Sequence, residues 1–304
     1  MKKILLSLSM IAVVAIIAVG ATGAFFSDTE TSTGNTFAAG AIDLGVDNHS
    51  YYNGVLNDGT TWRVDYDIDP LLGDNPDTTN VVETDYVIEA GRQFFNFDDL
   101  KPGDWGEDTI SLHVKNNDSY LCADVTLTSD EDNDQTEPEI DDGDLIANNG
   151  PQNDDGELAD SINFYWWADD GDNVYETCQD TAGGLNGCKD ETLLPAGSLG
   201  NLDVGDTATV ALADSDENIW GDPNFALPGD SVRFVAKAWC FGDNEMEPYA
   251  QDGGNQQSGP DDRPIKCDGA GENNMTQTDS LTADISFRAV QSRNNADFQC
   301  QIPD

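Results

Sequence analysis

The sequence predicts an all-β fold, because apolar and polar residues alternate along several stretches, turn residues separate those stretches, and helical periodicity is missing after residue 24. A period of two puts every second side chain on the same face of a strand, which is typical of a half-buried sheet. The alternating runs are 62–68, 110–114, 121–127, 232–240 and 281–289. No stretch of the mature chain carries apolar residues at i, i+3 and i+4 over several turns, as an amphipathic helix would.

Two Pro-Gly turns introduce predicted strands. The sequence Lys-Pro-Gly-Asp at 101–104 precedes the run at 110–114, and Leu-Pro-Gly-Asp at 227–230 precedes the run at 232–240. Proline fixes φ at the second turn position, and the glycine that follows accepts the positive φ of a type II turn. The segments 48–60, 69–80, 129–160 and 243–279 are rich in Asp, Asn, Gly and Pro, and we expect them to be surface loops.

The first 24 residues have the layout of a secretory signal peptide. Lys2 and Lys3 precede an apolar run at 4–19, and small residues follow at 20–24. This order of charge, apolar core and small residues predicts cleavage between Ala24 and Phe25, with cleavage after Gly23 as the nearest rival. An uncleaved membrane anchor is the alternative, because the apolar run is long for a signal core. Contact with a membrane is expected only through the uncleaved leader, and signal peptidase is the expected partner during export.

The formal net charge is −46, with 59 Asp and Glu against 13 Lys and Arg. Binding to nucleic acid through neutralisation of phosphates is therefore excluded as a function. The acidic surface has two interpretations, a solubilising surface suited to salty surroundings or a means of binding cations.

Six cysteines in an exported chain predict disulfide bonds. Cys178 and Cys188 bracket a Gly-rich loop, which makes them the first expected pair. Cys240 and Cys267 flank a polar loop and come next, and Cys122 with Cys300 remains. Spacing alone does not fix the connectivity of six cysteines, so other pairings stay open.

The chain shows no pattern typical of an enzyme. Its two histidines, His49 and His113, lie far apart and neither begins a His-Glu-x-x-His zinc motif. A Gly-x-Ser-x-Gly elbow and a phosphate-binding loop are also missing. We therefore expect no catalytic residues and no required cofactor, and a hydrolase ranks last among the functions considered.

One acidic loop is a candidate site for Ca²⁺. Asp169, Asp170, Asp172 and Glu176 follow an aromatic stretch at 164–167, and Gly171 lets the chain bend between them. Ca²⁺ takes six to eight oxygen ligands, which such a loop supplies. The spacing does not match an EF-hand loop, and a solvated hairpin tip is the alternative interpretation. A second acidic stretch, at 130–144, has no comparable anchoring strand.

The start of the mature chain resembles the leader junction of the TasA and camelysin family of biofilm matrix proteins. The resemblance lies in Ala-Phe-Phe-Ser-Asp-Thr-Glu at 24–30 and Asn-Thr-Phe-Ala-Ala-Gly-Ala-Ile-Asp-Leu at 35–44. The segment 96–104, Asn-Phe-Asp-Asp-Leu-Lys-Pro-Gly-Asp, is similar to the next landmark of that family. Residues 48–93 lie between the two landmarks and look like an insertion. Camelysins have been catalogued as metallopeptidases, but this chain carries no zinc motif, so that activity is not carried over.

The resemblance implies a jelly-roll-like antiparallel β-sandwich whose subunits polymerise into fibres by donor-strand exchange, after export with a SipW-type signal peptidase. It divides the chain into a signal peptide (1–24), a donor-strand segment (25–37) and a sandwich domain (38–304) with inserted loops at 48–93, 129–160 and 243–279. Phe25, Phe26 and Phe37 are the apolar anchors of the donor segment.

We therefore expect a secreted structural protein of the extracellular matrix or cell surface that forms homo-oligomeric fibres. The alternative is a monomeric cell-surface module that binds Ca²⁺ or carbohydrate.

Overall fold

The computed structural model describes residues 27–31, 43–62, 92–97, 99–144, 156–178, 190–194, 197–251 and 259–301. The signal peptide, the predicted cleavage position at Ala24 and Phe25, and the anchors Phe26 and Phe37 lie outside the described residues. Within the described part of the chain, no helix is long and apolar enough to cross a membrane.

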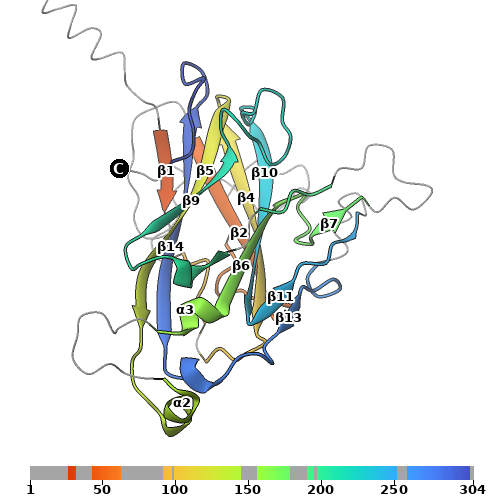
Figure 1. Cartoon of the computed structure of the whole chain (residues 1–304). Helices are drawn as coiled ribbons and strands as arrows, with labels where there is room; N and C mark the ends of the chain where they lie inside the picture. The colour runs from red at the N-terminus through yellow and green to blue at the C-terminus, as the bar shows by residue number, and fades with distance from the viewer. Residues whose placement is uncertain are drawn as a thin grey trace, which may run out of the picture.

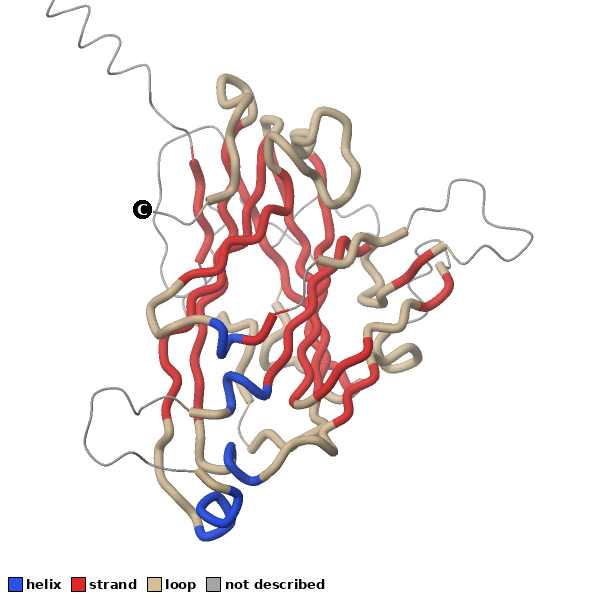
Figure 2. The backbone as a smooth tube through the Cα atoms, in the orientation of Figure 1, coloured by secondary structure: helices blue, strands red, loops and turns tan. Residues whose placement is uncertain are grey.

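Two antiparallel sheets face each other and form a sandwich (Figures 1 and 2). Sheet A contains, in spatial order, β1 (Ser27–Thr31), β14 (Ser280–Gln291), β5 (Ser119–Glu131) and β9 (Thr207–Ala213). Sheet B contains β3 (Val55–Leu56), β2 (Asp43–Tyr52), β4 (Trp105–Lys115), β10 (Ser231–Phe241), β6 (Ile162–Asp169) and β8 (Gly197–Ser198). The prediction of an all-β sandwich is confirmed, and the jelly-roll winding stays a prediction.

Apolar side chains from the inner faces of both sheets form the main core. Sheet A contributes Leu121, Ala123, Ile285, Phe287 and Ala289 among others, and sheet B contributes Leu44, Val46, Ile110, Leu112, Val114 and Val235. These positions alternate along their strands, as expected from the period of two. The predicted runs at 110–114, 121–127, 232–240 and 281–289 therefore lie in β4, β5, β10 and β14.

The outer face of sheet B is covered by shorter elements, which Figure 1 shows on the side of sheet B away from sheet A. They are β7 (Glu176–Thr177) paired with β12 (Tyr249–Ala250), and β11 (Asp243–Glu245) paired with β13 (Lys266–Asp268). Tyr175, Met246 and Ile265, which lie next to these strands in the chain, pack against Trp167, Ala236 and Ala238 of the sheet. As a result, the second part of β10, residues 235–241, is buried on both faces.

In the described part of the chain, four short helical turns lie between the strands. They are α2 (Glu137–Asp142), α3 (Leu158–Ser161), η1 (Leu199–Asn201) and η2 (Asn274–Thr276). The helix α2 begins with a capping box in which Thr136 and Glu139 satisfy each other's backbone amides, and a proline stands in its first turn.

The prediction of a surface loop at 48–60 is wrong in its first part, because β2 continues to Tyr52 and β3 follows at Val55–Leu56. The alternation was hidden because two inner-face residues of β2, Asn48 and Ser50, are polar and yet buried. The Asn48 side-chain amide donates there to the Thr60 carbonyl at 2.7 Å. The insertions expected at 129–160 and 243–279 likewise contain the end of β5, α2, β11, β12, β13 and η2. Of the run predicted at 62–68, Trp62 bridges to Asn48, and the rest lies outside the described residues.

The two Pro-Gly turns differ. Gly103 has φ of +91°, and the Asp104 amide donates to the Lys101 carbonyl at 2.8 Å, as a type II turn requires. In the second turn the positive φ falls on Asp230 rather than on Gly229. The Asp230 carboxylate accepts from the Asn116 amide at 3.1 Å, and this bond holds the turn against the end of β4.

Between cysteines that the structure describes, two disulfides fasten surface segments onto the sandwich. Cys122 of β5 is bonded to Cys300, and Cys240 of β10 is bonded to Cys267 of β13. Both are pairs expected from the sequence. Cys188 lies outside the described residues, so the pair of Cys178 with Cys188 stays a prediction.

Candidate cation site and assembly edge

The candidate Ca²⁺ loop begins where β6 ends, at Asp169. The Asp169 carboxylate accepts from the backbone amides of Gly171 at 3.0 Å and Asn173 at 3.3 Å, and from the Trp167 indole at 3.3 Å. These bonds fold the loop back over its own strand. Gly171 has φ of +112° with the Phe234 ring 3.2 Å from where a Cβ would lie, so a residue with a side chain would be strained there.

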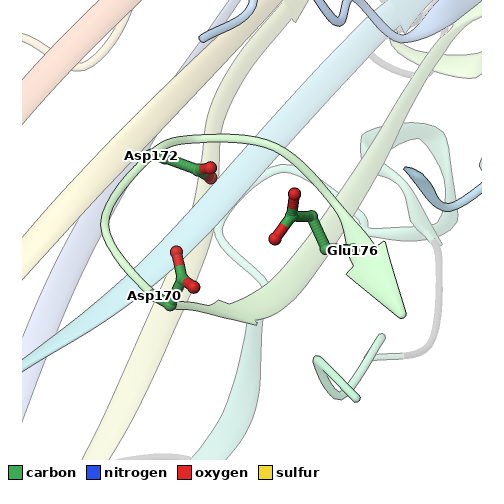
Figure 3. Close-up of side chains that lie close together, drawn as sticks. All are labelled: Asp170, Asp172 and Glu176. Atoms are coloured by element: carbon green, nitrogen blue, oxygen red, sulfur yellow. The ribbon is translucent and has the colours of Figure 1, made fainter. Parts of the chain in front are cut away.

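Three of the four predicted ligands converge inside this loop (Figure 3). One carboxylate oxygen from each of Asp170, Asp172 and Glu176 lies within 4.8 Å of the others. Asp172 and Glu176 are buried, and Asp170 is partly buried. The fourth predicted ligand, Asp169, is not in this group, because its oxygens are used to shape the loop.

Glu191 is a fifth carboxylate of the site, which the sequence analysis did not identify. It accepts from the backbone amides of Asp170 at 3.0 Å and Glu176 at 2.7 Å, and thereby ties the two ends of the loop together. The Glu191 amide in turn donates to the Glu176 carbonyl at 3.1 Å. Because 15 residues separate the two glutamates, only this local pairing of the chain brings Glu191 to the site.

The site is crowded with negative charge. Burial, then the charges of Asp169 and Asp170, raise the pKa of Asp172 to about 9. Burial and the charge of Asp169 also raise the pKa of Glu191, and burial with the charge of Asp170 raises that of Asp169. Among the described residues, the cation that pairs with this group is Arg263, through Glu176. A bound cation would offset the remaining repulsion between these carboxylates.

Glu107 of sheet B is a further carboxyl group that interacts electrostatically with the acidic loop. It lies on β4, is 1% exposed, and its pKa is raised well above the ordinary value by burial and then by the charges of Asp169 and Asp108. Its Oε2 atom has no hydrogen-bond partner among the described residues, and the same is true of Asp172 Oδ2. The donors available here are all oxygen atoms, which suits a hard cation such as Ca²⁺ and not Zn²⁺.

The second candidate region is the edge of sheet A. The edge strand β1 pairs antiparallel with β14 over five residues, from Ser27 opposite Val290 to Thr31 opposite Ser286. On the same side of β14, residues 280–285 have no described strand partner, although β5 pairs along the whole of the other side. Figure 1 shows β1 beside one end of β14 only.

A groove of about 840 Å³ adjoins this open part of β14. It is lined by residues 280–285 of β14, by the segment around Phe95 and Phe97, and by Phe164, Trp239 and Phe241 of sheet B. Trp239 and Phe97 lie with their ring centroids 4.9 Å apart, so aromatic surface forms one wall. The rest of the lining includes polar side chains such as Gln93, Asn96 and Asp279.

Of the two histidines, His113 lies 2.9 Å from the Asp47 carboxylate on the outer face of sheet B. His49 stacks edge-on against Tyr51, with ring centroids 5.2 Å apart.

Comparison of the chain with family models, with curated proteins and with solved structures finds no match.

Proposed function

We propose that the mature chain is a secreted subunit of extracellular fibres, similar to the TasA family, and that it joins its neighbours by donor-strand exchange. The observation that carries the proposal is the one-sided, five-residue pairing of β1 with β14. This strand lies close to the predicted N-terminus of the mature chain at Phe25. A short terminal edge strand is the kind of element that two copies of a protein exchange at low cost.

The physical reason is that exchange conserves the hydrogen bonds of the sheet. If β1 leaves its own β14 and pairs with the β14 of a neighbour, the same main-chain bonds form between subunits. Residues 32–37 would then follow β1 along the open part of β14, at 280–285. In this proposal Phe25, Phe26 and Phe37 occupy apolar pockets, and the aromatic wall of the groove supplies one of them.

The two disulfides support export, because such bonds form and persist outside the reducing cytoplasm. The charge of −46 sets a condition for assembly, since docking brings like charges together. The screening length falls from about 30 Å at 0.01 M salt to about 8 Å at 0.15 M salt, so fibres should form at the higher salt concentration. No catalytic activity is part of this proposal.

Electron microscopy of the purified mature protein tests the proposal. Replacing Asp28 and Thr29 with proline removes the strand N–H groups of both, so the pairing fails whichever of the two amides faces β14. The matched variant with alanine at both positions keeps the backbone donors. We expect fibres from the wild type and the alanine variant, and folded monomers from the proline variant and from a deletion of 25–37. Monomers from the wild type in every salt condition would refute the proposal.

The second candidate function is binding of Ca²⁺ by the loop that carries Asp170, Asp172 and Glu176. The convergence of these three carboxylates supports it. Tb³⁺, which has oxygen chemistry like that of Ca²⁺, should show luminescence sensitised by Trp167, whose indole donates to Asp169. Ca²⁺ should displace it. Asp172→Asn should abolish the signal, while Asp141→Asn on exposed α2 should leave it unchanged. An unchanged signal in Asp172→Asn would exclude this site.

A further inference from the structure

Lys237 and Asp108 form a fully buried pair on the inner face of sheet B. Lys237 lies on β10 directly opposite Asp108 on β4. The Lys237 side chain is 0% exposed and that of Asp108 is 1% exposed, with Nζ and Oδ2 2.6 Å apart. The pair therefore lies inside the sandwich, on the face of the strands that carries the core.

The Lys237 side chain ends between aromatic rings in a site without water-exposed surface. Its Nζ lies 3.5 Å from the ring centroid of Phe95 and 5.9 Å from that of Phe94. An ammonium carries three donors, but Nζ makes no aligned hydrogen bond with any described residue, despite its short distance to Asp108. Burial lowers the pKa of Lys237, and the charge of Asp108 opposes this shift.

The other carboxyl oxygen of Asp108, Oδ1, accepts a hydrogen bond from the side chain of Asn48. Asn48 Nδ2 lies 3.3 Å from Asp108 Oδ1 and also donates to the Thr60 carbonyl at 2.7 Å. A donor on one oxygen withdraws electron density from the carboxyl carbon, while the nitrogen of Lys237 stands beside the other oxygen. An amine and a carboxyl group are thus fixed side by side with water excluded.

We propose that Lys237 and Asp108 condense to form an intramolecular amide that covalently joins β10 to β4. A proton passes from the ammonium to the carboxylate and gives a neutral amine and a neutral acid. The nitrogen lone pair attacks Cγ of Asp108, and a bond between Nζ and Cγ forms. The bond between Cγ and one carboxyl oxygen breaks, and that oxygen leaves as water with two protons that came from the ammonium. No oxidant, reductant or further reactant is needed.

Two physical arguments support the reaction. Fixing the reacting groups side by side replaces a bimolecular step by a unimolecular one, and well-oriented groups reach effective concentrations of about 10⁵ M. A buried ion pair with unsatisfied donors is also costly, and a neutral amide removes both charges from the core. The inference is independent of fibre formation, because it concerns two strands of the same subunit.

Mass spectrometry of the folded, purified protein after reduction of its disulfides tests the proposal. We expect a mass lower than that of the linear sequence by about 18 Da, the mass of one water, and a branched peptide that joins Lys237 to Asp108. Lys237→Met and Asp108→Ala should show no such loss. Lys266 with Glu247 is an internal control, because this ion pair is exposed and should stay uncondensed.

The wild-type protein alone decides the outcome, even if both variants fail to fold. Linear peptides for both residues, with the full sequence mass, would show that the pair is an ion pair only and would overturn the proposal. A loss of about 17 Da, the mass of ammonia, mapped to Lys237 and Asn48 would also overturn it, because the acceptor would then be the amide of Asn48.

Discussion

The two sheets of the sandwich are completed in different ways. The outer face of sheet B is covered by β7, β11, β12 and β13, fastened by the disulfide of Cys240 with Cys267 and ordered around the acidic loop. Sheet A ends in the five-residue strand β1, next to an open stretch of β14 and a groove. In the function we propose, sheet B holds the subunit together, and sheet A is the sheet that a neighbour completes.

The largest effect on stability is expected from breaking the buried pair of sheet B. Lys237→Met removes the proposed link and leaves the Asp108 carboxyl group buried without a partner, and loss of one partner of a buried pair costs about 3–5 kcal/mol. Chemical denaturation measures this loss as a lower unfolding midpoint. The double variant Lys237→Met with Asp108→Leu should recover part of the stability, because two apolar residues leave no buried charge. A single variant as stable as the wild type would mean that sheet B does not depend on this pair.

The next largest effect is expected from the disulfide that fastens the cover of sheet B. Replacing Cys240 and Cys267 with serine should cost about 2–4 kcal/mol, since the bond restricts the unfolded chain. Hydrogen exchange should show loss of protection first in β11 and β13 and little change in β1. If protection falls equally in both sheets, the two regions are not independent.

A smaller effect is expected from the acidic loop. If Ca²⁺ binds there, a concentration about 100 times its dissociation constant should stabilise the fold by about 2.7 kcal/mol. Asp172→Asn should weaken binding about ten- to hundredfold, and thermal unfolding with and without Ca²⁺ measures the change. The control Asp141→Asn should respond to Ca²⁺ like the wild type. A stabilisation that survives Asp172→Asn would place the cation elsewhere.

The smallest effect is expected for the pH dependence of stability, through two carboxyl groups close to the groove beside sheet A. Burial raises the pKa of Glu157 to about 7 and that of Asp279 to about 6. Both carboxyls bind their protons more tightly in the folded than in the unfolded chain. Their contribution to stability is therefore complete below about pH 4 and is lost as the pH rises through 6 to 7. Thermal unfolding in the absence of divalent cations should give a higher midpoint at pH 5 than at pH 8, and Asp279→Asn should reduce the difference.

The alternation of the sequence was sufficient to predict β4, β5 and β14, because Ile110, Leu121 and Phe287 lie on inner faces where apolar side chains meet. It was less informative for β10. The apolar face identified at 232–240 is the covered outer face, and the inner face carries Lys237. From the sequence alone, a lysine in an alternating strand is expected to face solvent. Only the pairing of β10 with β4 shows that Lys237 is buried opposite Asp108.

The candidate cation site was also only partly predictable, because some of its carboxylates are brought together only by the fold. Asp170, Asp172 and Glu176 stand in one short loop, so their proximity follows from the sequence. Glu191 and Glu107 reach the same region through chain pairing and through β4, and no local pattern marks them. Asp169 could not be excluded as a ligand from the sequence, because its three hydrogen bonds depend on how the loop folds.

The most direct test of the account asks whether β1 pairs with its own β14 or with that of a neighbour. Thr31 and Ser286 lie directly opposite each other in the register, at a separation that a disulfide can bridge. The variant Thr31→Cys with Ser286→Cys should be assembled under fibre conditions, oxidised and separated without reducing agent. We predict a ladder of covalent oligomers, which neither single variant should give. An internal disulfide within monomers only, together with the absence of fibres, would contradict donor-strand exchange.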